Sequence, residues 1–213
     1  MKTLTNFIGI FIVLLFTGCT GKTTVKNISE NLGITKSYGV DLGLSVNWAE
    51  YNVGAESPDK IGYRTTLGNV KGTTKAPVTS KIDISGTDAD IASVKMGDGW
   101  RMPTGPEMKE LLEKCTWTPD TLNGTNGFRV TGPNGNSIFL PDTGPNYSFD
   151  QLANQDIFYD VPIQDSREGN YWCGTPVTEY YNCNHICFDS KRQKVELMRC
   201  EPYFLCAVRA VHD

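Results

Sequence analysis

The sequence predicts an α+β domain, and three features of the chain lead to that fold class. A strong helix signature lies at residues 104–115, short alternating polar and apolar stretches flank it, and loops rich in Gly, Pro and Asn separate those stretches. A helical period beside several period-2 segments is typical of a helix packed against a small antiparallel sheet. We therefore take the helix as the element on which the sheet packs.

The helix signature begins at Thr104. Thr104 and Glu107 have the spacing of a capping box, in which a hydroxyl and a carboxylate bond the free amides of a helix start. Pro106 is tolerated in the first turn. Apolar residues then recur at i, i+3, i+4 and i+7, namely Met108, Leu111, Leu112 and Cys115. This stripe predicts one buried face.

Upstream of this helix, residues 40–48 alternate strictly between apolar and polar side chains, which predicts the first strand of the domain. Residues 52–80 are rich in Gly, Thr, Lys and Pro and are interpreted as a loop with a hairpin. Residues 88–96 favour a short helix that leads into the Gly99-Trp100 pair.

Downstream, the runs 128–131 and 138–140 flank Asn134-Gly135, a strong hairpin signal because both residues tolerate positive φ. Residues 141–169 form a long irregular stretch, and loops of that length are more often functional than accidental. Further strands are expected at 170–173, at 185–188 paired with 194–198, and at 204–211.

The N-terminal region has the features of an export signal. Lys2 precedes an apolar run over residues 7–16 that is too short to span a membrane. Phe16-Thr17-Gly18-Cys19 resembles a bacterial lipobox, which implies cleavage before Cys19 and lipid attachment to its sulfur. The sequence is therefore predicted to contain three regions: a signal peptide (1–18), a lipidated cysteine with a polar tether (19–37) and the domain (38–213). An ordinary secretory signal is the alternative.

Composition excludes one class of partner. The formal net charge is −4 at pH 7, and no basic block occurs anywhere in the chain. A nucleic-acid-binding protein needs a basic stripe that follows the phosphates, so nucleic acid is not an expected partner. The predicted contacts are instead the membrane, through the lipid anchor, and an unknown surface ligand that is a protein or a glycan.

Six cysteines remain besides Cys19: Cys115, Cys173, Cys183, Cys187, Cys200 and Cys206. An even number in an exported chain permits a disulfide framework, for which six cysteines allow fifteen connectivities. A zinc site is a second interpretation, since Cys183, His185 and Cys187 lie close in sequence. Their spacing matches no standard structural zinc motif, so neither a metal site nor a cofactor is predicted.

Several blocks together resemble the Fibrobacter succinogenes major paralogous domain, which occurs in exported proteins of Bacteroidetes. The blocks are residues 40–49, 99–104, 111–112, 115–117, 127–141, 171–172 and 175–176. The resemblance covers about 38–211. It implies a C-type-lectin-like fold: a small twisted antiparallel sheet, one or two helices and a long loop-rich region near the C-terminal strands. A shared fold does not by itself define chemistry.

Two related groups bear on function. In variable proteins of diversity-generating retroelements, the last strands and loops carry a hypervariable ligand-binding surface that ends in a motif similar to residues 207–211 here. In formylglycine-generating enzymes, two cysteines before a similar terminal arginine bind copper and oxidise a substrate cysteine. Cys200 and Cys206 precede Arg209 in a comparable way, with five residues between them where that family usually has four.

The favoured hypothesis is a ligand-binding surface in the C-terminal region. Many residues there are of types reached by substituting adenines in an asparagine codon, as retroelement diversification would do. Tyr also supplies rigid contact area and Asn supplies adaptable hydrogen bonds. The candidate ligand-binding residues are Trp172, Tyr180, Tyr181, Asn182, Asn184, His185, Tyr203 and Phe204.

Two alternatives remain open. A copper-dependent oxidase would use Cys200 and Cys206, because paired thiolates select Cu(I). In a purely structural envelope domain, the candidate ligand-binding residues would simply belong to an ordinary polar loop. Within the blocks that resemble the family, Trp48, Trp100 and Trp172 are expected to lie in the hydrophobic core. Arg101 and Arg209 are expected to pair with carboxylates or carbonyls, as structural residues.

Overall fold

The computed structural model describes residues 39–70, 82–145, 167–177 and 182–213, all within a unit that spans Tyr38–Asp213. The predicted signal peptide, Cys19 and the tether lie outside the described residues. The elements in chain order are β1 (Asn47–Trp48), β2 (Arg64–Thr65), α2 (Ile91–Met96), α3 (Gly105–Lys114), β3 (Thr116–Leu122), β4 (Thr125–Thr131), β5 (Ser137–Pro141), β6 (Glu168–Val177), β7 (Asn182–Asp189), β8 (Lys194–Cys200), β9 (Cys206–Ala207) and β10 (Val211–His212). This confirms the predicted α+β class.

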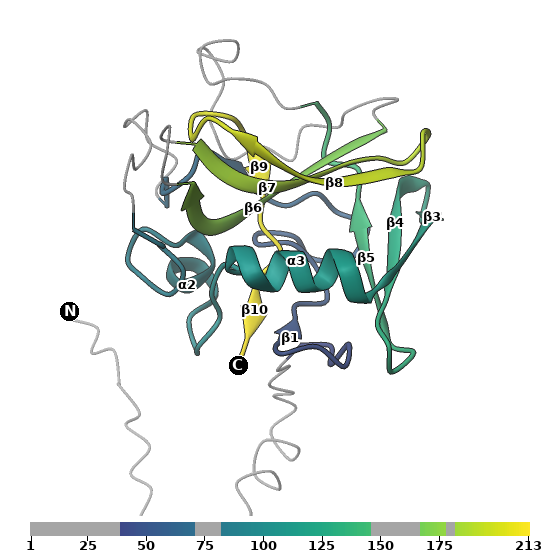
Figure 1. Ribbon diagram of the computed structural model, residues 1–213, viewed down its shortest axis with the longest axis horizontal. Helices are drawn as coiled ribbons and strands as arrows, with labels where there is room; N and C mark the ends of the chain where they lie inside the picture. Colours follow the sequence, from purple (N-terminus) through teal and green to yellow (C-terminus); the bar gives the residue numbers. More distant parts are fainter. Residues whose placement is uncertain (1–38, 71–81, 146–166, 178–181) are drawn as a thin grey trace, which may run out of the picture. The chain divides into compact units, whose positions relative to one another are not determined.

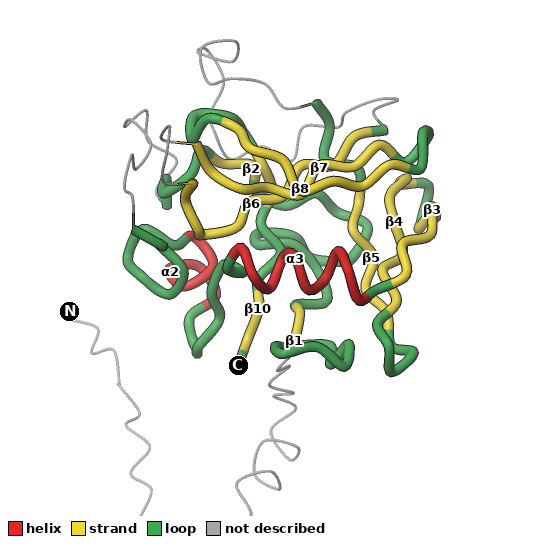
Figure 2. Tube along the Cα trace, in the orientation of Figure 1, coloured by secondary structure: helices red, strands yellow, loops and turns green. Residues whose placement is uncertain are grey.

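The strands in the described part of the chain form three open sheets (Figure 1). The largest has the order β2-β9-β6-β7-β8, in which only the pairing of β6 with β9 is parallel. A second sheet has the order β3-β4-β5, and β1 pairs with β10 in a third. Figure 2 shows α3 running beside the large sheet, and it contacts β6, β7 and β8.

Helix α3 confirms the strongest sequence prediction. Thr104 is the N-cap, and both bonds of the capping box to Glu107 are present. The predicted stripe is turned inward, with Met108 and Leu111 each 1% exposed and Cys115 half-buried at the C-cap. In the described parts of the chain, no helix is long and apolar enough to cross a membrane.

Helix α2 begins at Ile91, three residues later than the start of the predicted segment. Asp90 caps it, because its Oδ1 accepts hydrogen bonds from the amides of Ala92 (2.8 Å) and Ser93 (3.2 Å). The other carboxylate oxygen accepts from the Met102 amide at 2.7 Å. One fully buried carboxylate therefore joins α2 to the segment that opens α3.

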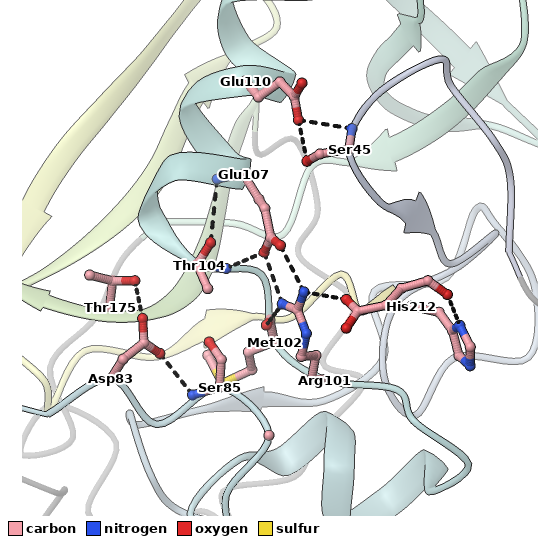
Figure 3. A network of polar contacts seen from close by, with 12 residues as sticks. Ser45, Asp83, Ser85, Arg101, Met102, Thr104, Glu107, Glu110, Thr175 and His212 are labelled. Carbon is pink, nitrogen blue, oxygen red and sulfur yellow. Dashed lines mark hydrogen bonds and ion pairs between the residues drawn. The ribbon is translucent and has the colours of Figure 1, made fainter.

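A polar network surrounds the start of α3 (Figure 3). The Arg101 guanidinium donates to both carboxylate oxygens of Glu107, at 2.9 and 2.7 Å, and pairs with Asp213 at 2.5 Å. Glu107 also accepts from the Thr104 amide at 2.7 Å. Burial opposes ionisation of Glu107, but these bonds outweigh it and lower its pKa. Arg101 is thus a structural residue, as predicted.

The predicted strand over residues 40–48 is wrong, because only β1 has strand geometry. Val40 N donates to Trp48 O at 2.7 Å and Trp48 N returns a bond to Val40 O at 3.0 Å, so the segment folds back on itself. Gly43 lies at φ +74°, with its amide bonded to Asp41 Oδ1 at 2.7 Å. This Asx turn reverses the chain in a segment whose alternation looks like one strand.

The hairpin predicted around Asn134-Gly135 is confirmed by the pairing of β4 with β5. The structure adds β3, which the sequence analysis missed, on the other side of β4. Asn123-Gly124 makes that turn, with φ of 49° and 84°. The signal is the same Asn-Gly pair that marks the predicted hairpin. Pro119 is tolerated because β3 is an edge strand.

The strand predicted at 204–211 is broken into β9 and β10, which belong to different sheets. Arg209 lies between them with 1% of its surface exposed. Its guanidinium donates to Asn52 Oδ1 (2.9 Å), Ala49 O (3.1 Å), Glu50 O (2.9 Å) and Phe139 O (2.7 Å). Burial lowers the pKa of Arg209 to about 10, which leaves it charged at neutral pH. Its predicted structural role is confirmed.

The core has two parts on opposite faces of the large sheet. Tyr171 belongs to the cluster beside α3 and the three-stranded sheet, and its neighbour Trp172 belongs to the cluster that contains Met102 and residues of α2. Successive side chains of a strand point to opposite faces, so β6 contributes to both. Trp48 is 1% exposed and Trp172 is fully buried, as predicted for the core, and Trp100 is half-buried.

Candidate functional site

The candidate surface lies where β8 ends and the chain turns toward β9. Tyr203 is 38% exposed and Met198 is 44% exposed. Phe204 is half-buried, and its ring centroid lies 5.5 Å from that of Tyr203. Phe204 packs on the same cluster as Cys200, and Met198 shares a face of β8 with Cys200. We call Met198, Tyr203 and Phe204 the C-terminal surface.

The turn that carries the two aromatic rings is fixed at several points. Phe204 N donates to Glu201 O at 3.1 Å, and Pro202 O accepts from the Leu67 amide at 2.9 Å. The Tyr203 hydroxyl donates to the Glu201 carboxylate. The residues that follow the turn, from 205 to 211, are buried. The turn therefore presents Tyr203 from a rigid base.

Two predicted ligand-binding residues are corrected by their burial. Trp172 is fully buried, and its Nε1 donates to Thr65 O at 2.8 Å. His185 is 3% exposed and lies edge to face with the Trp172 ring, with centroids 6.0 Å apart. Neither side chain reaches a ligand at the surface in this structure. Trp172 belongs to the buried cluster on which Phe204 packs, and His185 lies opposite Met198 in the β7–β8 pair.

Of the remaining candidates, Asn184 lies on the face of the sheet opposite to that of Met198. Asn184 is half-buried, and its side-chain amide lies beside Gly105 at the start of α3. Adjacent positions in a strand face opposite sides, so Asn184 lies across the sheet from His185. Tyr180, Tyr181 and the side chain of Asn182 lie outside the described residues.

Met198 is the member of the C-terminal surface that the sequence analysis missed. It is the cross-strand partner of His185 in the β7–β8 pair. Glu196, Met198 and Cys200 alternate with the other residues of β8, so they share one face. That alternation was visible in the sequence, but nothing local indicates that a methionine at this position stays exposed.

A group of sulfur atoms lies beneath the surface. Cys200 and Cys206 stand as thiols, 9% and 0% exposed, and the two side chains interact. Burial, followed by the contact with Cys200, raises the pKa of Cys206 well above its ordinary value. The described residues contain no group of three or more side chains arranged to hold a metal ion.

The other end of the β7–β8 hairpin carries a cavity of about 160 Å³. Its lining consists of Glu168, Cys187, Phe188, Asp189, Arg192, Lys194 and Glu196. Among these lining residues, Arg192 pairs with Asp189 at 3.0 Å and Lys194 pairs with Glu196 at 2.8 Å. The cavity holds a half-buried thiol among mixed charges.

Comparison with known proteins adds no relative. No protein-family model matches the chain. No curated protein matches it significantly. No solved structure matches it significantly either.

Proposed function

We propose that this protein is a non-enzymatic, lipid-anchored ligand-binding protein of the cell envelope, displayed at the outer membrane or cell surface. Its domain is proposed to have a C-type-lectin-like fold. Among the described residues, the small antiparallel sheets and the helices α2 and α3 support that fold. The apolar run at 7–16 and the lipobox-like segment before Cys19 support the anchor.

The observation that carries the binding proposal is the exposure of Tyr203 on an anchored turn. Tyrosine is enriched at the energetic centres of interfaces because its ring buries a large area at low entropic cost. Backbone bonds fix the turn, and the Tyr203 hydroxyl donates to the Glu201 carboxylate. The ring has therefore already lost much of the freedom that binding would remove. This favours recognition by the C-terminal surface.

The chemistry of this surface favours an uncharged or weakly polar partner. It combines the Met198 thioether with the rings of Tyr203 and Phe204, and the neighbouring Glu201 carboxylate accepts a hydrogen bond from the Tyr203 hydroxyl. Aromatic faces pack on the apolar faces of sugar rings as well as on apolar side chains, so a glycan and a protein segment are the two ligand classes. The chain's net charge of −4 disfavours polyanions.

The alternative copper-oxidase proposal is less well supported. It requires Cys200 and Cys206 to meet both copper and a substrate, and Cys206 is fully buried with a raised thiol pKa. A thiol is a metal ligand only as the thiolate. If no ligand is found, the result favours the other alternative, a purely structural envelope domain.

The proposal is tested by screening the purified chain against a printed array of defined glycans and a displayed peptide library. The Tyr203→Ala variant is screened in parallel. Signals that the wild type gives and the variant loses support the C-terminal surface as the binding site. Retroelement diversification is tested separately at the DNA level, by searching for a template repeat whose differences are confined to adenines.

A further inference from the structure

The sequence contains three Asn-Gly pairs, at residues 123–124, 126–127 and 134–135. Such a pair is prone to deamidation, because glycine has no side chain to keep its backbone nitrogen away from the side chain of the preceding asparagine. The reaction needs a glycine amide that can attack and an asparagine side chain that can turn toward it. The structure treats the three pairs differently in both respects.

The Asn123-Gly124 pair is exposed in the turn between β3 and β4. Among the described residues, the Gly124 amide donates no backbone hydrogen bond. The Asn123 side chain is held there by a single bond, from Nδ2 to Asp59 Oδ1, and its 3.3 Å length exceeds the usual N–H···O range. Apart from the chain neighbours, nothing lies within 4 Å of the position that a Cβ on Gly124 would take. Little therefore holds the two reacting groups apart.

The Asn134-Gly135 pair is also exposed, but its groups are bonded. Gly135 N donates to Gly132 O at 3.0 Å. The Asn134 side chain is held at both ends, because Nδ2 donates to Asp41 O at 2.9 Å and Oδ1 accepts from Asn136 N at 3.0 Å. An attack by the Gly135 nitrogen on this side chain requires the turn to give up these bonds.

The Asn126-Gly127 pair is held by a sheet. Both residues belong to β4, the central strand of the order β3-β4-β5. Gly127 is buried, opposite Asp120 on one side and Pro141 on the other. Asn126 Oδ1 accepts a hydrogen bond from the Thr121 hydroxyl at 3.0 Å. Rotation of this backbone would disrupt the strand pairing, so the folded protein suppresses the reaction here.

We propose that Asn123 is a modification site, at which the folded protein deamidates selectively with water as the co-reactant. The Gly124 amide nitrogen attacks Asn123 Cγ and forms a new C–N bond. The Cγ–Nδ2 bond breaks, and Nδ2 leaves as ammonia with the proton that the Gly124 nitrogen loses. Water then opens the resulting succinimide ring at one of its two carbonyls, which gives aspartate or isoaspartate. The reaction needs no oxidant or reductant.

The product changes a contact between distant parts of the chain. Asn123 Nδ2 donates to Asp59, whose side chain is 5% exposed and also accepts from Ser57 Oγ at 2.8 Å. Deamidation replaces this donor with a carboxylate, so two negative charges then face each other. Lys60 lies 3.3 Å from Asp59 and compensates only one of them. The β3–β4 turn is therefore expected to separate from the segment that contains Asp59.

The experiment incubates the full chain at pH 8 and 37 °C and maps aspartate and isoaspartate at each Asn-Gly pair by fragment mass spectrometry. Deamidation at Asn123 is expected to be at least tenfold faster than at Asn126 and Asn134. A sample unfolded in guanidinium chloride is the control, because each asparagine is then followed by glycine without a fold around it. There the three rates should lie within threefold of one another.

The proposal is overturned if Asn123 and Asn134 deamidate within twofold of each other in the folded wild type. It is also overturned if the unfolded chain shows the same preference for Asn123 as the folded chain, because the local sequence would then be the cause. Both results come from the wild type and do not depend on any variant.

Asn123→Gly is the matched variant, since glycine tolerates the φ of 49° at this position. It should lose the deamidation product of this turn. Asn123→Asp reproduces the product, and comparison of the two variants isolates the added charge. Amide hydrogen exchange over residues 57–63 should be at least threefold faster in Asn123→Asp than in Asn123→Gly. Equal exchange in the two variants would contradict the expected effect on the Asp59 contact.

Discussion

Arg209 Nε donates a 2.9 Å hydrogen bond to Asn52 Oδ1, and this contact joins residues that lie 157 positions apart in the chain. The same guanidinium serves three backbone carbonyls, on the segment after β1 and on β5. Amide and carbonyl oxygens therefore stabilise the buried guanidinium. None of these four acceptors is a carboxylate. This side chain joins the first and last parts of the domain, together with the pairing of β1 with β10 and of β2 with β9.

Arg209→Met is expected to lower the free energy of unfolding by at least about 3 kcal/mol. The methionine leaves buried carbonyls without donors, and each buried acceptor left unsatisfied costs about 1–3 kcal/mol. Arg209→Lys should restore little, because one compact ammonium cannot span acceptors that a planar guanidinium reaches. Urea unfolding at pH 7 measures both.

Arg129→Met is the matched control for this loss. Arg129 is 44% exposed and pairs with Asp120 at 2.7 Å, so its replacement should cost less than about 1 kcal/mol. If Arg209→Met and Arg129→Met lower the free energy of unfolding equally, the hydrogen bonds of Arg209 do not stabilise the fold as proposed.

Glu107→Gln tests the network at the start of α3. The glutamine keeps the shape of the cap but loses the charge that Arg101 holds, so we expect a loss of about 1–3 kcal/mol at pH 7. Because the folded state lowers the pKa of Glu107, this stability is present above its ordinary value of 4.5. It is lost as the pH falls through the folded pKa.

Glu113→Gln is the control on the same helix. Glu113 is 61% exposed and lies 3.7 Å from Lys109, a contact worth at most about 0.5 kcal/mol. Thermal unfolding should separate Glu107→Gln from wild type at pH 7, and the difference between them should become smaller at pH 3, because protonation of Glu107 removes part of its contribution. If the stability difference between Glu107→Gln and wild type is the same at both pH values, the charge of Glu107 is not its cause.

Asp142 should make the protein less stable as the pH rises. Burial raises its pKa from 3.8 to about 6, against a hydrogen bond from Ser190 at 2.8 Å and the charge of Arg167. The folded state thus binds this proton more tightly than the unfolded state. The resulting stability is full below pH 3.8 and is lost as the pH rises through 6.

Asp142→Asn, which mimics the protonated carboxyl, is expected to be about 1–2 kcal/mol more stable than wild type at pH 8. The advantage should shrink toward zero at pH 4. Urea unfolding at the two pH values makes the comparison. A variant that is no more stable at pH 8, or that has the same advantage at pH 4, would rule out the buried ionisation as the cause.

Cys19→Ser tests the proposed anchor in cells of the source organism or a bacterial host that processes lipoproteins. The wild type should fractionate with membranes and incorporate labelled palmitate, because two or more acyl chains give firm anchoring. The variant should do neither. Membrane retention without palmitate incorporation in the wild type would favour another mode of attachment.

Local signals in the sequence were enough to predict the helices and one hairpin. The Thr104–Glu107 box defines α3 because capping involves residues three positions apart. The Asn134-Gly135 turn defines a hairpin in the same way. Segment 40–48 misled the prediction, because alternation reports a buried face and says nothing of a reversal at Gly43.

Nonlocal partners explain the other errors. The strand predicted at 204–211 is divided because β9 and β10 pair with different N-terminal segments, which no local pattern reveals. Trp172 and His185 are buried by the layer on one face of β6 and β7, and the sequence cannot say which face of a sheet is covered. Tyr203 was predicted from its residue type and its position in the C-terminal region, and the structure places it, exposed, in the turn between β8 and β9.

The central claim, that the C-terminal surface binds a ligand, is tested most directly by isothermal titration of the first glycan or peptide identified in the screens. Tyr203→Ala should weaken its Kd at least tenfold. Tyr51→Ala, which removes an equally exposed (38%) tyrosine far from β8 in the sequence, should leave the Kd within twofold. Equal Kd values for wild type and both variants would contradict the claim.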